Sequence, residues 1–448
     1  MIHKTILFLV SISLILPATD FQTQVGHTEI TKWQYGKKAA VSLTYDDSTI
    51  NQFRVALPLM NERGFPGTFY IVTGAIPGSE YEPKFVGRPV EEIIAETAQI
   101  PTNKENFYER ASAIRFLGYE GTYRYHNEAA GFYGNGELQK AYDIIDEGFR
   151  KVRNGEFEPS NGYHDELYNV LAIEDPSVDL ITWDKLQKYA QQDHEFGSHT
   201  ILHPWLAVMD SANIRYELEK SRLDILNHLG PGHTFSAECP FGTEDERVMK
   251  YAHKIFPALR NRMPHPWLAE LNRASDIDPR TPEKEYVQWQ RGPLSDTPVK
   301  KMKSWIDTSL EKDNIWLVLV FHGIEGVGWE PLSKDKLKEY FDYIKKHEEQ
   351  LWVATFKDVT KYHRERMNAD IKSKRSGQTV TINLTHSLDR ALYRLPLTLK
   401  TYVPEKWKAA QVKQEGQTQG IEIQEDEKGA FIQYQAQPNS GSIIITEQ

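Results

Sequence analysis

Apolar and polar positions follow a repeating order of strand and helix along most of this chain. Short, nearly continuous apolar runs at 39–45, 67–72 and 315–321 predict strands that are buried on both faces. Between such runs, apolar positions recur with helical spacing, as in 214–229 and 334–347. Strands that alternate with helices of this length indicate an α/β fold with a parallel sheet, but periodicity does not separate a barrel from an open sheet. Further strands are expected at 196–200, 234–237, 258–263, 286–290 and 352–356, and further helices at 51–63, 182–192, 245–256, 298–310 and 357–371.

Two regions interrupt this order. Residues from about 74 to 179 form a long, Tyr-rich segment with mostly helical patterning. It is either an insert without a role at the functional site or a lid that shapes the substrate site. From 373 to 448 the pattern changes to short alternating runs between Gly, Asn and Pro turns, which predicts a small β-sandwich domain. We therefore expect one α/β domain over 20–372, with the insert inside it, and a β-sandwich over 373–448.

The first residues have the composition of an export signal. Lys4 precedes the apolar run 5–16, and small residues around Ala18 follow it, which predicts a signal peptide over 1–19. The alternative is a retained membrane anchor, although the run is short for a membrane span. With the signal removed, we expect a periplasmic or extracellular protein without integral membrane association. Cys239 is the single cysteine, so no internal disulfide is expected.

The charge balance argues against a nucleic-acid partner. The chain has 53 Lys and Arg against 63 Asp and Glu, a formal net charge of −10. Phosphate backbones are bound by clustered positive charge, so nucleic acid is a poor candidate for this protein. A neutral or partly cationic glycan would meet no such repulsion.

Three segments place chemically active side chains at or just after predicted strands. Asp46 and Asp47 follow the first strand, where they serve either as a functional pair or as a cap for the next helix. In an extended strand, the side chains of two adjacent residues point in opposite directions. His199 and His203 are four residues apart, a spacing that on a helical turn lets two histidines share a metal. His322 ends the most apolar strand, directly before a glycine.

Together these side chains form a consistent set for a metal-dependent hydrolase. Two histidines and one carboxylate leave a divalent metal open to water and substrate. The second carboxylate can then act as a base, and His322 as an acid. The donor set favours one divalent ion, Zn²⁺, although other first-row metals could bind.

The same segments resemble a known family. The stretches TYDDS, GSHTILHP, ECPFG and LVFHG are similar in sequence and order to motifs of the polysaccharide deacetylases of carbohydrate esterase family 4, the NodB-homology fold. The resemblance covers roughly 38–362 without the insert, and it implies a distorted (β/α) barrel. It further implies that Asp47, His199 and His203 bind the metal, that Asp46 is the base, and that His322 is the acid. The backbone N–H of Phe241, next to Pro240, would hold the oxyanion.

Some positions depart from the family pattern. Glu238 stands where the family's third motif carries an arginine that orients the base, and the replacement could be Arg260, Arg262 or Arg291. Asp276 and Trp289 are weak candidates for the family's fourth motif. Trp329 either forms a wall of the acetyl pocket or belongs to the core. The other histidines, among them His126, are expected to be ordinary core or surface residues.

The predicted function is removal of N- or O-linked acetyl groups from an acetylated polysaccharide or oligosaccharide. Two alternatives remain. One is a non-catalytic glycan-binding protein on the same fold, for which Glu238 is the argument. The other is a metallohydrolase that acts on an amide outside carbohydrates.

Overall fold

The computed structural model describes residues 24–160, 167–168 and 171–448, so the expected signal peptide lies outside the described residues. The chain forms two compact units. The larger unit comprises Lys32–Asn368 and Ser387–Leu395, and the smaller comprises the described residues up to Thr31 with Ala369–His386 and Pro396–Gln448. No helix in the described part of the chain combines the length and the apolar character needed to cross a membrane.

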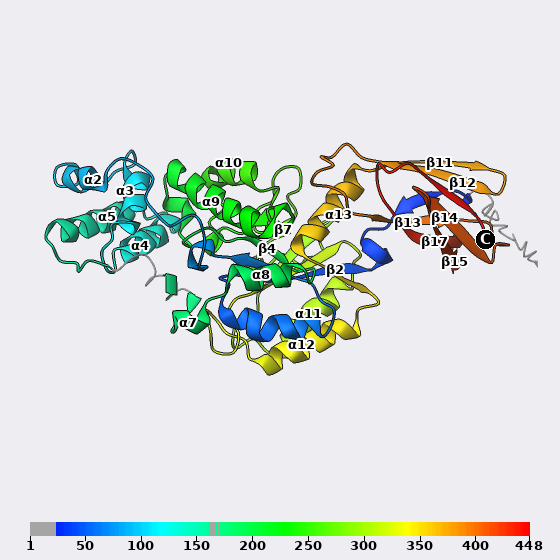
Figure 1. Ribbon diagram of the computed structural model, residues 1–448, viewed down its shortest axis with the longest axis horizontal. Coiled ribbons are helices and arrows are strands. Elements are labelled where there is room, and N and C mark those ends of the chain that lie inside the picture. Colours follow the sequence, from blue (N-terminus) through cyan, green and yellow to red (C-terminus); the bar gives the residue numbers. More distant parts are fainter. Residues whose placement is uncertain (1–23, 161–166, 169–170) are drawn as a thin grey trace, which may run out of the picture. The chain divides into compact units, whose positions relative to one another are not determined.

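A parallel sheet forms the centre of the larger unit (Figure 1). Its strands lie in the order β6-β5-β4-β3-β2-β9-β8-β7, and β10 pairs with the first half of β2. The strands are β2 (Ala39–Tyr45), β3 (Gly67–Ile71), β4 (Glu195–Ser198), β5 (Ser236–Ala237), β6 (Ala258–Leu259), β7 (Glu270–Leu271), β8 (Val287–Arg291), β9 (Ile315–Phe321) and β10 (Leu351–Val353). Every residue of β2 and β9 is buried, which confirms the prediction from their continuous apolar runs.

The crossover helices surround this sheet. They are α1 (Leu57–Asn61), α8 (Trp183–Ala190), α9 (Ser211–Leu229), α10 (Glu246–Ile255), α11 (Val299–Ser309), α12 (Lys334–Lys346) and α13 (Phe356–Asn368). Local capping fixes where several of them begin, because the side chains of Asp210, Asp245 and Ser333 accept backbone N–H groups at the starts of α9, α10 and α12.

The sheet is a curled, open barrel, which confirms the predicted distorted (β/α) class. Its terminal strands, β6 and β7, do not pair with each other in the described part of the chain. Side chains bridge this opening instead, since the amides of Gln288 and Gln290 on β8 both donate to the carbonyl of Arg260, which follows β6. These hydrogen bonds hold the residue after β6 against β8 across the opening.

The interruption within the α/β order is helical, as predicted. It contains α2 (Val90–Glu96), α3 (Phe107–Arg115), α4 (Tyr123–Gly134), α5 (Leu138–Arg153) and α7 (Pro176–Asp179). Figure 1 shows α2–α5 as a cluster beside the sheet, and they enclose a small core of their own around Ile114, Ile145 and Phe149.

Two predicted helices differ from the structure. The helix expected at 51–63 is a π-helical turn, Gln52–Ala56, followed by the short α1. Pro58 lies in this segment and lacks the N–H that a regular helix would use there. The helix expected to reach residue 371 ends at Asn368, because Asp370–Ser376 pairs with β12 as strand β11.

The smaller unit consists of two antiparallel sheets, β1-β13-β17-β16 and β11-β12-β18-β14-β15. The strands are β1 (Thr28–Ile30), β11 (Asp370–Ser376), β12 (Thr379–Thr385), β13 (Leu397–Tyr402), β14 (Ala409–Gln414), β15 (Gln417–Glu422), β16 (Gln424–Asp426), β17 (Gly429–Ala436) and β18 (Ser442–Glu447). Alternate side chains on β12 and β18 are buried, as the period-two pattern predicts. Strand β1, which precedes the larger unit in sequence, pairs with β13, which follows it. The smaller unit is therefore not one continuous segment.

Candidate metal centre

Asp46 and Asp47 lie at the carboxyl end of β2, in the middle of the sheet. The N–H of Asp46 still donates to the carbonyl of Phe321 on β9, at 2.9 Å, and so continues the ladder. At Asp47 and Ser48 the backbone turns into the left-handed region, with φ values of 72° and 53°. The two carboxylates are therefore separated by a tight turn rather than by the alternation of a strand, as the sequence had suggested. Neither caps the following helix.

The two histidines follow β4, but not on a helical turn. His199 donates its N–H to Ile71 of β3 at 2.8 Å, and Thr200 and His203 both have left-handed φ values, 69° and 55°. The prediction of helical geometry at this spacing is therefore wrong. The loop is held from α9, where the buried carboxylate of Glu217 accepts the N–H groups of Ile201 and Leu202 at 2.8 and 3.0 Å.

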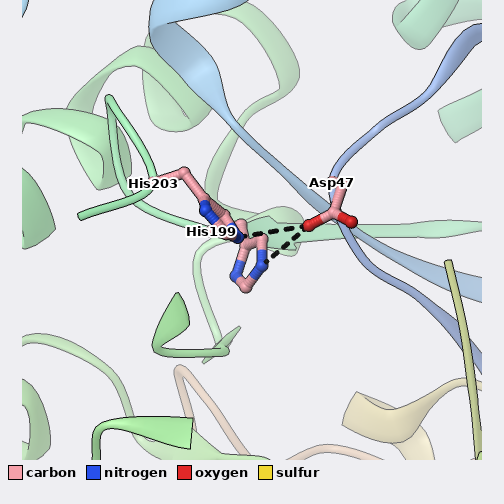
Figure 2. A group of neighbouring side chains, drawn as sticks. All are labelled: Asp47, His199 and His203. Atoms are coloured by element: carbon pink, nitrogen blue, oxygen red, sulfur yellow. Dashed lines mark ion pairs between the residues drawn. The ribbon is translucent and has the colours of Figure 1, made fainter. Parts of the chain in front are cut away.

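These two turns bring Asp47, His199 and His203 together, and all three side chains are buried (Figure 2). The Nε2 atoms of His199 and His203 lie 3.5 and 3.2 Å from the same carboxylate oxygen of Asp47. Burial raises the pKa of Asp47, but hydrogen bonds from the two histidines outweigh this effect and hold that pKa well below its usual range.

The donor set fits a divalent metal. The carbonyl of Glu238 can only accept, so His199 must carry its proton on Nδ1 to make the 3.0 Å bond between them. In the neutral ring that binds a metal, with Nε2 deprotonated, this tautomer leaves the Nε2 lone pair of His199 directed at the cluster, which is the usual arrangement for a metal ligand. His203 also directs its Nε2 atom at Asp47. Its other ring nitrogen, Nδ1, is buried and has no hydrogen-bond partner among the described residues.

Arg260, one of the three arginines considered from sequence, contacts the second aspartate. Its Nη1 and Nη2 each donate to one carboxylate oxygen of Asp46 at 2.7 Å, a bidentate pair that is buried on both sides. Burial raises the pKa of Asp46, while the charge of Arg260 and its hydrogen bonds lower it, and the net pKa lies below the ordinary value. Arg262 instead donates to the Glu244 carbonyl, and Arg291 to the carbonyls of Gln290, Arg273 and Ser275.

Glu238 lies beside the same arginine. Its Oε1 is 3.1 Å from Nη2 of Arg260, and it also accepts from the amide of Asn261. The acidic residue at the family's arginine position is thus matched by an arginine that follows the neighbouring strand, β6. Burial is the main cause that raises the pKa of Glu238 well above its ordinary value.

His322 completes the group at the end of β9. Its Nε2 lies 3.5 Å from Oδ2 of Asp46, and the ring of Trp329 meets its ring edge to face at a centroid distance of 4.8 Å. Burial lowers the pKa of His322. The weak fourth-motif candidates do not join it, since Trp289 packs under the guanidinium of Arg291 and Asp276 is exposed.

One cavity of about 850 Å³ is lined by the Asp47–His199–His203 cluster, the Asp46–Arg260 pair, Glu238 and His322. Two exposed aromatic walls flank it. On one side the rings of Phe241 and Trp205 stack at 4.2 Å with an angle of 5° between their planes, and on the other side lies the half-exposed Trp329. Trp329 is therefore a cavity wall and not a core residue. Pro240 is buried in the turn before Phe241, whose φ is 61°.

The complete lining includes residues that the sequence did not single out. It consists of Asp46, Asp47, Ala172, His199, His203, Trp205, Glu238, Phe241, Gly242, Glu244, Arg260, Asn261, Asn272, Arg273, Ala274, Gln290, Val320, His322, Gly328 and Trp329. Glu244, Asn261, Asn272 and Arg273 follow short or irregular segments, where neither periodicity nor motif spacing carries a signal. Burial raises the pKa of Glu244 to about 7.

The helical insert contacts the histidine loop directly. Arg115 of α3 donates to the carbonyl of Leu202 at 2.8 Å, and Nε2 of His126 on α4 accepts the N–H of Trp205 at 3.3 Å. Nδ1 of His126 donates to the Ala111 carbonyl at 2.8 Å, so one neutral tautomer satisfies both contacts. Burial, together with the charge of Arg115, lowers the pKa of His126 to about 3. The expectation of a core histidine is confirmed, and the insert supports the loop that carries His199 and His203.

Comparison with known proteins gives a match over part of the chain. A family model described as polysaccharide deacetylase matches residues 137–255, which include His199 and His203. Over 277 residues, 58% of this chain, the sequence is 24% identical to a gellan lyase from Bacillus sp., and the chain spans about 11% of the length of that relative. Residues 137–255 are therefore similar to the polysaccharide deacetylase family, as the motifs had suggested.

Solved structures of the same kind show low overall similarity. A family 4 carbohydrate esterase from Bacillus subtilis matches with a TM-score of 0.32 and 12% identity, covering 75% of this chain and 83% of that one. The esterase domain of a multidomain xylanase from the Trinervitermes trinervoides hindgut metagenome has a TM-score of 0.32 and 11% identity, with coverages of 72% and 89%. A family 4 pseudoenzyme from Bacillus anthracis has a TM-score of 0.31 and 14% identity, with coverages of 72% and 66%.

Proposed function

We propose that this protein is a metal-dependent hydrolase that removes N- or O-linked acetyl groups from a polysaccharide or oligosaccharide. The observation that carries the proposal is the shared cavity, in which the Asp47–His199–His203 cluster lies beside the Asp46–Arg260 pair and His322. Each group needed to hydrolyse an acyl bond is therefore present in one place.

Asp47, His199 and His203 would hold the metal, for which zinc is the favoured ion because two imidazoles and a carboxylate are typical of it. A divalent ion held there supplies positive charge that polarises a carbonyl and makes a nearby water more acidic. The three protein ligands leave room for substrate, since the cluster opens into the cavity.

Asp46 would accept the proton of the attacking water. Arg260 keeps this carboxylate ionised and fixes its orientation through two parallel hydrogen bonds. The same pairing lowers the proton affinity of Asp46 and so makes it a weaker base. In return, the carboxylate of Asp46 keeps a fixed position and stays ionised. Arg260 therefore acts through Asp46 and is a positioning residue.

His322 would donate a proton to the departing sugar oxygen or nitrogen. It lies at the strand end opposite the histidine loop, with Asp46 between them at 3.5 Å from its Nε2. The backbone N–H of Phe241, which lines the cavity, would stabilise the negative oxygen of the tetrahedral intermediate.

The two alternatives are less well supported. A degraded, non-catalytic site was suggested by Glu238, but Arg260 supplies a guanidinium to Asp46 from the adjacent strand. An amide substrate outside carbohydrates would not need two exposed aromatic walls, whereas sugar rings present apolar faces to Trp and Phe rings.

Acetate release from a panel of acetylated glycans tests the proposal. We expect release by the zinc-loaded protein, loss of release after chelation, and recovery when zinc is restored. Asp46→Asn is the matched control, because it keeps the shape and the metal ligands. Binding of these glycans without any acetate release would support the non-catalytic alternative instead.

We also propose export of the protein to the periplasm or the extracellular medium, supported by the apolar run at 5–16 after Lys4. Mass spectrometry of the mature N-terminus tests this. Cleavage near residue 19 is expected, and an intact N-terminus in the membrane fraction would contradict it.

A further inference from the structure

The side chain of Arg273 lines the cavity on the side of Trp329. Its guanidinium lies 5.6 Å from the centre of the Trp329 ring, and the residue is exposed to solvent. It stands in the segment between β7 and β8, so neither the metal ligands nor the Asp46–Arg260 pair includes it.

Asp46, Glu238 and Asp47 act on the charge of Arg273 only from a distance. Arg260, the other arginine in the cavity, is committed to Asp46 and Glu238. Among the residues that the structure describes, no carboxylate forms an ion pair with Arg273. A guanidinium directed into a substrate cavity without a partner is suited to bidentate contact with a carboxylate of the ligand.

The surrounding backbone is shaped to admit this side chain. A Cβ atom on Gly292, directly after β8, would lie 2.9 Å from Cδ and 3.0 Å from Nη1 of Arg273. The same Cβ would lie 2.9 Å from the carbonyl oxygen of Val320, so a larger residue at 292 would crowd both that backbone and the guanidinium. The lack of a side chain at this position therefore makes room for Arg273 at the cavity.

We propose that the substrate is a glycan with a carboxylate-bearing sugar, and that Arg273 binds this carboxylate. This inference rests on the proposed function and adds the chemical class of its substrate. The ring of Trp329 is close to both His322 and Arg273. Its centroid lies 4.8 Å from the centroid of the His322 ring and 5.6 Å from the guanidinium carbon of Arg273. A sugar ring on Trp329 would thus have its leaving atom near His322 and an acidic substituent near Arg273.

The test compares two probes that differ in one charge. One is an acetylated trisaccharide with a single glucuronic acid residue, and the other is the same trisaccharide with that carboxylate capped as a methylamide. Calorimetry on the zinc-loaded full chain gives Kd for each, and acetate release gives kcat/KM. The variants are Arg273→Gln, Arg273→Lys and, as a control on the same segment, Arg280→Gln, whose guanidinium pairs with Asp278 and Glu311 at the surface.

We expect the wild-type protein to bind the acidic probe more tightly than the capped one by on the order of ten-fold. Arg273→Gln should abolish this preference by weakening only the acidic probe, Arg273→Lys should retain part of it, and Arg280→Gln should leave it unchanged. Equal affinity of the wild-type protein for both probes, or a preference that survives Arg273→Gln, overturns the inference. Preferential binding of the acidic probe without acetate release from either probe or from 4-nitrophenyl acetate would support the anionic ligand while contradicting the deacetylase function.

Discussion

The buried pair between Arg260 and Asp46 allows a quantitative test of the site. Arg260→Met keeps the aliphatic stem but removes the guanidinium, which makes two 2.7 Å bonds to Asp46 and lies 3.1 Å from Glu238. Both carboxylates stay buried in the variant and lose the guanidinium, while Asp46 keeps His322 at 3.5 Å and Glu238 keeps the amide of Asn261. Removal of one partner from a buried ion pair destabilises a protein by about 3–5 kcal/mol.

Arg262→Met is the matched control, because Arg262 pairs with Glu246 at 3.8 Å on the surface, where the side chains are 39% and 93% exposed. Such a pair contributes about 0–1 kcal/mol. Guanidinium chloride unfolding in the presence of a chelator, followed by tryptophan fluorescence, measures both variants. The signal reports on the larger unit, since every tryptophan except Trp407 lies within it.

A second substitution tests whether the buried carboxylates cause the loss of stability in Arg260→Met. Glu238→Gln removes one of the two carboxylates that lose Arg260, so the double variant Glu238→Gln/Arg260→Met should recover part of the lost stability. A variant Arg260→Met within about 1 kcal/mol of Arg262→Met would refute the reasoning, because an exposed pair costs no more than that. A double variant that is less stable than Arg260→Met alone would likewise contradict it.

Three further predictions follow from the site and its supports. Asp47→Ala should lower the zinc stoichiometry, whereas Asp46→Asn should keep the metal and lose on the order of 10²-fold or more in turnover; the opposite pattern of metal contents would reverse the two roles. His126→Ala should weaken zinc binding by about ten-fold, because Trp205 beside His203 loses its support, and an unchanged zinc Kd by competitive titration would mean that the insert does not support the loop. Truncation after residue 371 should lower the unfolding midpoint of the larger unit, because it removes Tyr393, whose hydroxyl accepts from buried Arg364 at 2.8 Å; an unchanged fluorescence midpoint would contradict this.

The chain by itself determined most of the elements and the identity of the reactive groups. Strand β9 was predicted over the same residues that the structure gives, because a continuous apolar run records burial on both faces locally. Asp46, Asp47, His199 and His322 were found because each lies at or directly after a predicted strand and parallel strand ends meet at one edge, and His203 was found by its spacing from His199. Antiparallel strands in the C-terminal region were expected for the same reason, since their period-two alternation is also local.

Only the tertiary structure decided how these groups are partnered. Arg260 could not be chosen over Arg262 and Arg291 from sequence, because the choice depends on β6 lying next to β5 in the sheet. The same holds for the support of the histidine loop by the insert, and for the position of Arg273 against Trp329. Periodicity reports what each residue buries within its own element, whereas an ion pair or a cavity wall depends on which distant elements the folded chain makes neighbours.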